Sequence, residues 1–131
     1  MQSNDDFIGG TILLVDDEKD VREYVFHALQ HAGYAVVQAS SGSEALSRFE
    51  HFGQDIDLLV TDLVMPGLHG DQLAVKLLAE KPELKVIFIS GNIKQGMETA
   101  IPLEEGVNYL RKPFGLSDLE NLVERKLGSE N

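Results

Sequence analysis

Aspartates at the ends of two apolar segments are the residues of this sequence best suited to chemistry. The segment "ILLVDDE" runs from four apolar residues directly into Asp16 and Asp17, and "DLLVTD" ends in Asp62. Burying a carboxylate costs free energy unless a partner compensates for the lost hydration. Each of these aspartates therefore needs a partner.

Two further polar residues close apolar segments in the same way. The segment "VIFIS" ends in Ser90, and "YLRKP" places Lys112 directly before Pro113. If the four segments are parallel strands of one sheet, their carboxyl ends meet at one edge. A hydroxyl group and an ammonium group would then converge with the three carboxylates.

Such a cluster favours a bound cation. Three carboxylates within about 5 Å of one another repel by several kcal/mol per pair at an effective dielectric near 20, so either some are protonated or a cation lies among them. Oxygen ligands without histidine or cysteine indicate a hard ion, and we expect Mg²⁺. Beside it, Asp62 could attack phosphorus as a nucleophile, while Lys112 neutralises charge on the transferred group and Ser90 donates a hydrogen bond to it.

Five apolar segments are predicted to be the strands that position these groups. They are Thr11–Val15, Ala35–Ala39, Ile56–Thr61, Val86–Ser90 and Val107–Arg111. Continuous apolar runs place the first, third and fourth strands in the centre, whereas mixed composition suits the second and fifth to the edges. We therefore expect an α/β fold, a doubly wound five-stranded parallel sheet of order 2-1-3-4-5 with helices on both faces, and a crevice between the first and third strands.

Helical spacing and capping patterns predict the first, second and last helices. The apolar stripe expected to face the sheet on the first helix consists of Val21, Tyr24, Val25, Ala28, Leu29 and Ala32. The patterns Ser41-x-x-Glu44 and Ser117-x-x-Glu120 are typical of capping boxes. They predict that the second helix and the last helix open there.

The remaining two helices have weaker patterns. Leu73–Leu78 indicates a third helix that ends before Pro82. Between residues 93 and 106, Gly96 and Pro102 predict only a short or irregular fourth helix.

Composition limits the class of protein. The chain has 131 residues, of which 43% are hydrophobic and 25% charged, as in a single globular domain. A net charge of −11 argues against unaided binding to nucleic acid, and the absence of cysteine excludes disulfides and thiolate metal sites. No apolar run reaches the roughly 20 residues of a membrane span, and "MQSNDDFIGG" lacks a signal-peptide core. We expect a cytoplasmic protein with a flexible segment (1–10), one domain (11–127) and a tail (128–131).

Four segments together resemble a known family. In this order, "ILLVDDE", "DLLVTDLVMPGLHG", "VIFISG" and "YLRKPF" are similar to the receiver domain of two-component response regulators, which has a flavodoxin-like (CheY-like) fold. The resemblance covers about residues 11–127. The entry "GGTILLVDDE" and the segment "FISGN" further resemble receivers appended to hybrid sensor histidine kinases.

The resemblance implies a signalling switch. Such a domain takes a phosphoryl group from a sensor histidine kinase or a histidine phosphotransfer protein, promotes its own phosphorylation and slow dephosphorylation, and acts on a downstream protein. It implies no direct contact with nucleic acid and no membrane insertion. The identity of the target, the formation of a homodimer and a free-standing or hybrid context stay open.

The resemblance also implies roles at the metal site. Asp62 would be the phosphoacceptor, and Asp17 and Asp62 would bind Mg²⁺ directly. Asp16 would act mostly through water, and the backbone carbonyl of Val64 would complete the protein ligands.

The same resemblance implies a switch. Lys112 would pair with the acceptor carboxylate or its phosphate, and the Lys112–Pro113 peptide is expected to be cis. Ser90 would be the switching hydroxyl, and Tyr109 the aromatic residue that turns inward when Ser90 moves. These shifts would alter the surface made by the fourth helix, the fifth strand and the last helix. Pro102 would change the shape of this surface.

Other interpretations remain for several residues. A phosphatase of the haloacid-dehalogenase type would need a second acid at Val64, and a pseudo-receiver would serve only as an interaction platform. In the receiver interpretation, Val64 and Asn92 would influence the lifetime of the phosphate. His27 and His31 are spaced for a shared metal but are expected to be exposed, and His69 is expected to be a loop residue without a catalytic role.

Overall fold

A five-stranded parallel sheet forms the centre of the molecule. The computed structural model describes residues 10–91 and 97–128. The strands are β1 (Thr11–Val15), β2 (Ala35–Ala39), β3 (Ile56–Asp62), β4 (Lys85–Ser90) and β5 (Tyr109–Arg111). The helices are α1 (Lys19–His31), α2 (Gly42–Phe52), α3 (Gly70–Glu80) and α4 (Leu116–Gly128). The strand order is β2-β1-β3-β4-β5 with every pairing parallel, which confirms the predicted topology.

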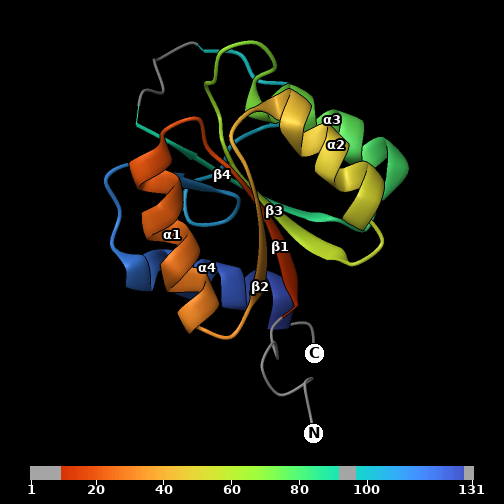
Figure 1. Cartoon of the computed structure of the whole chain (residues 1–131). Helices are drawn as coiled ribbons and strands as arrows, with labels where there is room; N and C mark the ends of the chain where they lie inside the picture. Colours follow the sequence, from red (N-terminus) through yellow and green to blue (C-terminus); the bar gives the residue numbers. More distant parts are fainter. Residues whose placement is uncertain (1–9, 92–96, 129–131) are drawn as a thin grey trace, which may run out of the picture.

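Two layers of helices cover the sheet. Helices α1 and α4 pack on one face, and α2 and α3 pack on the other (Figure 1). Alternate residues of β1 enter the two cores: Ile12 and Leu14 pack under α1 and α4, and Leu13 and Val15 pack under α2 and α3. Burial on both faces is the reason that this strand is a continuous apolar run.

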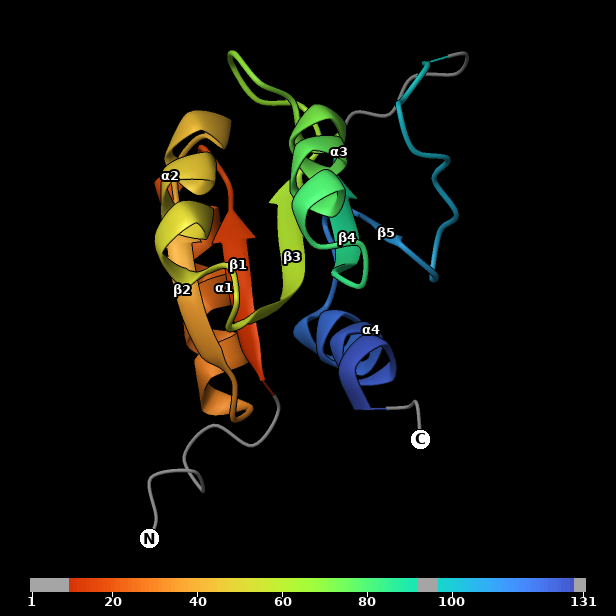
Figure 2. The ribbon, with the colours of Figure 1, turned by 90° about the vertical axis from the view of Figure 1, so that its right-hand side faces the viewer.

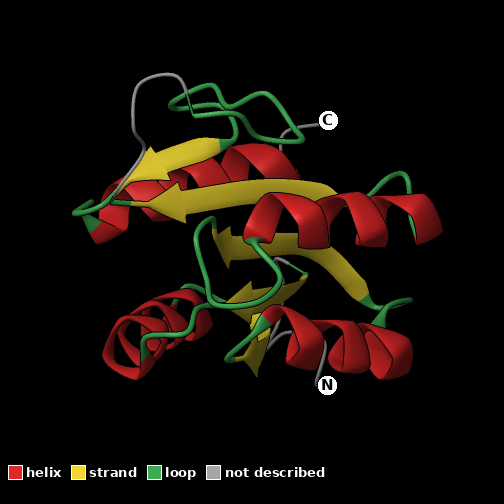
Figure 3. Ribbon diagram, turned by 90° about the horizontal axis from the view of Figure 1, so that it is seen from above, coloured by secondary structure: helices red, strands yellow, loops and turns green. Residues whose placement is uncertain are grey.

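The parallel direction brings the ends of the strands to one edge. β1 and β3 run upward in Figure 2, so the loops that follow them lie at the top of the sheet. Viewed from above, the loops after the central strands lie between the two helix layers (Figure 3). This edge is where the polar residues that close the strands are expected to meet.

The second helix begins as predicted, with one difference. The Ser41 hydroxyl accepts a hydrogen bond from the Glu44 amide at 3.0 Å. The Glu44 carboxylate accepts from the amide of Ser40 at 2.6 Å rather than from that of Ser41. Ser41 is therefore the N-cap, but the reciprocal bond of the capping box reaches one residue further back.

Two details of the predicted helices are wrong. α4 already begins at Leu116, where the carbonyl of Gly115 accepts the first helical bonds, so Ser117 lies inside the helix and cannot cap it. In α1, Tyr24 is 57% exposed and does not face the sheet with Val25 and Leu29. Ala32 follows the end of α1 and is also exposed.

The segment after β4 differs most from prediction. Residues 97–106 contain no helix, and the rest of the predicted fourth helix lies outside the described residues. Side chains hold the backbone instead: Asn108 accepts from the Glu104 amide and donates to the Pro102 carbonyl. Val107 and Asn108 form a turn, so β5 begins two residues later than predicted.

The two predicted terminal segments lie almost entirely outside the described residues. The expected flexible segment lies, except for Gly10, outside the described residues, as do residues 129–131. α4 continues through Gly128, and the domain bounds 11–127 stay a prediction. In the described part of the chain, no helix has both the length and the apolar character needed to span a membrane.

Candidate functional site

Three carboxylates meet at the edge of the sheet where β1 and β3 end. Oxygen atoms of Asp16, Asp17 and Asp62 all lie within 4.8 Å of one another. Asp16 and Asp17 directly follow β1, and Asp62 is the last residue of β3, which pairs with β1 up to Val15 and Thr61. Asp16 and Asp62 are buried and Asp17 is exposed, so the cluster opens to solvent on one side.

Lys112 supplies the positive charge of the cluster. Its Nζ atom lies 3.3 Å from Asp16 Oδ2, 3.4 Å from Asp62 Oδ2 and 3.5 Å from Glu18 Oε1. Its backbone amide donates to the carbonyl of Ser90, which fixes the start of the loop after β5. Burial lowers the pKa of Lys112, but Asp16 and Asp62 outweigh this effect and leave the pKa above its ordinary value.

One lysine does not balance the three acids. The pKa of Asp62 is raised to about 6, first by burial and second by the negative charge of the nearby Asp16 carboxylate. Burial also raises the pKa of Asp16. When ionised, the three aspartates carry three negative charges, against one positive charge from Lys112. A hard divalent cation fits this set of oxygen ligands and this excess of charge.

The two oxygens of Asp16 already have partners within the protein. Oδ1 accepts from the Glu18 amide at 2.9 Å, and Oδ2 accepts from Lys112. In the described part of the chain, the Asp17 carboxylate makes no such hydrogen bond. The neighbouring aspartates thus differ in their freedom to bind a cation.

The loop between β3 and α3 is closed by backbone contacts. The amide of Gly70 donates to the carbonyl of Leu63 at 2.8 Å, and a Cβ atom at Gly70 would overlap the carbonyl oxygen of Asp62. This close approach requires glycine. Val64 lies in this loop and is 43% exposed, so an apolar side chain occupies the place where a dehalogenase-type phosphatase would need its second acid.

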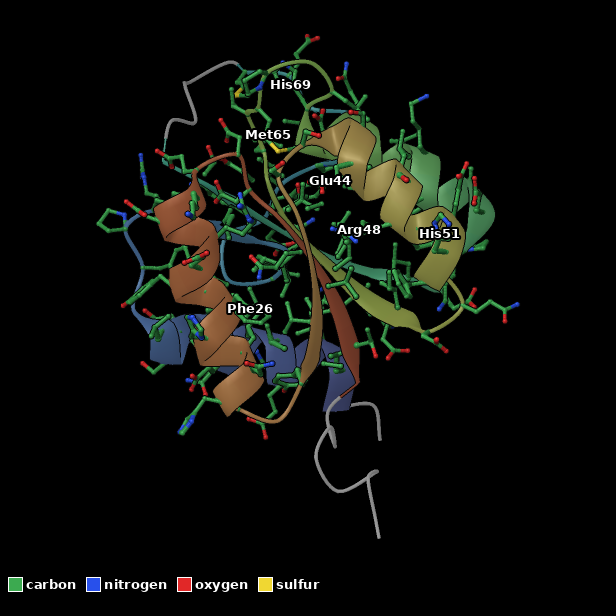
Figure 4. All side chains as sticks on the ribbon, viewed as in Figure 1. Phe26, Glu44, Arg48, His51, Met65 and His69 are labelled. Carbon is green, nitrogen blue, oxygen red and sulfur yellow. The ribbon has the colours of Figure 1, made fainter. Side chains whose placement is uncertain are left out.

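His69 has a role in this loop that sequence reasoning missed. Its Nδ1 atom accepts a hydrogen bond from the amide of Met65 at 3.3 Å, and its own amide donates to Gln72 at 3.0 Å (Figure 4). The position of this histidine directly before the first residue of α3 was the available signal. His69 holds the loop and does not contact the carboxylates through any of these bonds.

Ser90 and Tyr109 lie together at the next strand ends. β3 pairs Asp62 with Ile89, so Ser90 is one residue beyond the partner of Asp62. The Tyr109 side chain is buried, and its hydroxyl donates to the Ser90 carbonyl at 3.3 Å. The Lys112–Pro113 peptide is cis, as predicted.

The two histidines of α1 lie away from the sheet. His27 and His31 are both exposed, as expected. Among residues 10–91 and 97–128, the aspartate cluster is the sole group of three or more potential ligands close enough to hold a metal ion. Asn92, expected near the phosphate, lies outside the described residues.

Comparison with known families identifies the arrangement. Residues 12–124 match the response regulator receiver domain. The chain belongs to this family. Receiver domains are signalling switches of two-component systems; they bind Mg²⁺ at an acidic pocket and partner with histidine kinases or phosphotransfer proteins.

Two relatives of this receiver domain differ in length. The chain is 38% identical over 121 residues to the sensor kinase CckA of Brucella abortus, covering 92% of this chain but 13% of the kinase. It is 35% identical over 116 residues to the response regulator receiver protein CpdR of the same organism, covering 88% of this chain and 95% of CpdR. Similar receivers thus occur within a long kinase and as nearly the whole of a short protein.

A solved receiver structure has the same fold. The response regulator TrrA of Thermotoga maritima, in complex with Mg²⁺ and BeF, is 29% identical with a TM-score of 0.75. The match covers 90% of this chain and 99% of the TrrA chain.

Proposed function

We propose that this receiver domain accepts a phosphoryl group on Asp62 from a histidine kinase or a histidine phosphotransfer protein. The single observation that carries the proposal is the buried Asp62 carboxylate, which lies within 4.8 Å of two further carboxylates and 3.4 Å from the Lys112 ammonium. Clustered titratable groups with shifted pKa values, such as those of Asp62 and Lys112, are typical of a functional site.

Three side chains and one carbonyl would hold Mg²⁺. Asp17 and Asp62 would bind the ion directly, the Val64 carbonyl would bind it from the loop, and Asp16 would act through water. When bound, Mg²⁺ supplies positive charge that neutralises the carboxylates and the phosphoryl oxygens.

Asp62 would act as the nucleophile. A carboxylate oxygen forms a bond to phosphorus while the bond between phosphorus and the donor imidazole nitrogen breaks, and that nitrogen keeps the electron pair. The product is an acyl phosphate on Asp62 and a free imidazole on the donor. Lys112 would leave the carboxylate and pair with the phosphoryl oxygens, whose charge increases in the transition state.

The switch would run from Ser90 to Tyr109. Ser90 would donate its hydroxyl to a phosphoryl oxygen. Tyr109, whose ring is already buried and whose hydroxyl contacts the Ser90 backbone, would shift with it. The surface altered by these shifts would consist of residues 97–108, β5 and α4. This segment is not helical, so the surface differs in shape from one built on a helix.

The donor would approach over α1. An apolar groove beside Lys112 is lined by Val21, Tyr24 and Val25 of α1 and by Pro113 and Phe114. The exposed Tyr24 ring gives this groove apolar area that a partner helix can cover. A donor bound there would hold its phosphoryl group near Lys112. The downstream target, a homodimer and the cytoplasmic location stay predictions.

The test is adduct formation with a small phosphodonor. Incubation with acetyl phosphate and Mg²⁺ should add the mass of one phosphoryl group, and Asp62→Asn should abolish the addition. Asp57→Asn is a matched control, because Asp57 lies at the opposite end of the same strand. An adduct that persists in Asp62→Asn, or wild-type protein that gains none, would contradict the proposal. Turnover of a separate phosphate ester would indicate a phosphatase instead.

A further inference from the structure

Arg22 is not one of the clustered residues, but its side chain binds the peptide group that joins Asp16 to Asp17. Its Nη1 atom donates to the backbone carbonyl of Asp16 at 2.7 Å. Its Nε atom donates to the side-chain oxygen of Gln38 at 3.2 Å. One guanidinium thus connects the end of β1 to the edge strand β2.

The contact replaces a bond that the sheet does not provide. The amide of Asp16 still pairs with the carbonyl of Ala39, the last residue of β2. Beyond Ala39 the strand ends, and the chain enters α2 at Gly42. The Asp16 carbonyl therefore lies where the ladder has ended, and the arginine side chain takes the place of the next backbone donor.

This carbonyl belongs to the peptide that joins Asp16 to Asp17. Fixing it fixes the direction in which the chain leaves β1 and thus the position of the Asp17 side chain. The Asp16 carboxylate is also anchored by Glu18 and Lys112. For Asp17, which makes no side-chain hydrogen bond in the described part of the chain, the backbone path is what sets its position.

Gln38 orients the Arg22 guanidinium by accepting a hydrogen bond from its Nε atom. Its side chain lies on the same face of β2 as Val36, which packs in the core under α1. Arg22 is in the first turns of α1, where its backbone amide donates to the carbonyl of Glu18 at 2.9 Å. The planar guanidinium presents rigidly oriented donors on different nitrogen atoms, whereas an ammonium group carries all its donors on one nitrogen atom.

We propose that Arg22, oriented by Gln38, is a positioning residue that preorganises Asp16 and Asp17 for the divalent cation. Arg22 touches neither the cation nor the phosphoryl group. The inference rests on the proposed function, because it assigns a purpose to the geometry of the Mg²⁺ site. Loss of an outer contact that orients ligands typically weakens metal binding about 10-fold or more.

The experiment compares Mg²⁺ affinity in matched variants by titration calorimetry. Arg22→Met should raise the dissociation constant for Mg²⁺ about 10-fold, and Gln38→Met should raise it by a smaller factor. Arg22→Lys keeps the positive charge but loses the planar guanidinium that donates from Nε and Nη1. Its Mg²⁺ affinity should lie between those of wild type and Arg22→Met. Arg48→Met is the control, because Arg48 lies exposed on α2 (Figure 4) and, among the described residues, forms a salt bridge with Glu44 alone, at 3.4 Å.

A second readout needs no metal. Hydrogen exchange of the Glu18 amide, which donates to the Asp16 carboxylate, should become faster in metal-free Arg22→Met and stay unchanged in Arg48→Met. A folded Arg22→Met with wild-type Mg²⁺ affinity and wild-type exchange would overturn the inference. If that variant does not fold, Gln38→Met decides by the same two measurements.

The two proposals fail in different ways. Wild-type protein that binds no Mg²⁺ would refute the proposed function, while the exchange rates would still decide whether Arg22 holds the aspartates. If wild type and Arg22→Met bind Mg²⁺ equally tightly and also show equal exchange rates, only the positioning role is refuted.

Discussion

Two regions of the same sheet are held by different interactions. One is the carboxyl ends of the central strands β1 and β3, and the other is the edge strand β5 with the segment before it. β1 and β3 are covered on both faces, and their ends are fixed by ladder bonds and close backbone contacts. β5 has three residues, and the segment 97–108 before it contains no helix. It is held by a few hydrogen bonds from side chains and backbone groups and by the partly buried Ile101 and Leu103. The same fold thus combines a closely packed site with a more loosely held neighbouring surface.

This difference suits a switch. A phosphoryl site needs groups that are positioned before the reaction, because rearrangement would add to the barrier. A surface that changes on phosphorylation needs contacts that can be exchanged at small cost. The carboxylates lie in the first region, and the surface proposed to respond lies in the second.

The largest expected effect is the contrast between two glycines. Gly70→Ala should destabilise the protein by at least about 3 kcal/mol, because its Cβ would overlap the Asp62 carbonyl in the closely packed region. Gly106→Ala should cost only about 1 kcal/mol, because Gly106 has a φ of +81° but nothing within 4 Å of a Cβ atom. Free energies of unfolding from urea titration measure both. Equal costs would contradict the difference in packing.

The next effect concerns the bond that holds residues 97–108 to α3. The buried Asp71 carboxylate accepts from the Ala100 amide at 2.7 Å, so Asp71→Ala should cost about 1–2 kcal/mol and speed hydrogen exchange at Ala100. Asp71→Asn keeps an acceptor and should cost less.

Asp57→Ala is the control for this contact. Asp57 also accepts a backbone amide bond, from Thr11 at 3.0 Å, but at an exposed position. Its loss should leave exchange at Ala100 unchanged. An Asp71→Ala variant with wild-type exchange at Ala100 would show that other contacts hold the segment.

A separate effect is a pH dependence in the metal-free protein. The pKa of Asp62 is raised from 3.8 to about 6, so the folded state binds this proton more tightly than the unfolded state. The stability that protonated Asp62 contributes is therefore present below pH 3.8 and is lost as pH rises through about 6. Asp62→Asn cannot titrate and should be more stable than wild type at neutral pH, where the buried carboxylate is charged.

The measurement is the difference in free energy of unfolding between wild type and Asp62→Asn across this pH range, in the presence of a chelator. The difference should favour Asp62→Asn increasingly as the pH rises to about 6 and then stay constant. A difference that does not change with pH would mean that Asp62 titrates as an exposed aspartate does.

The sequence was sufficient to predict the regular part of the fold. Continuous apolar runs such as "ILLV" show that a strand is buried on both faces, and this alone favoured the observed strand order. The convergence of Asp16, Asp17 and Asp62 followed, because parallel strands end at one edge. These predictions depend on local pattern and on general rules of topology.

The parts that the sequence did not predict depend on contacts between distant residues. The local sequence does not indicate that the Asp71 carboxylate accepts a hydrogen bond from the Ala100 amide. It also does not indicate that the Asn108 side chain donates to the Pro102 carbonyl, or that β5 begins only at Tyr109. Ser117 has the pattern of a cap, but the chain after Pro113 already enters the helix at Leu116. The contact of Arg22 with Asp16 likewise depends on where β2 ends.

Titration of isotope-labelled protein with Mg²⁺, followed by NMR, tests the central claim most directly. The account predicts saturable shifts confined to the amides around Asp16, Asp17, Asp62 and Val64, together with an increase in the free energy of unfolding. Shifts that are absent, or that spread without saturation over the acidic surface while stability stays the same, would contradict it.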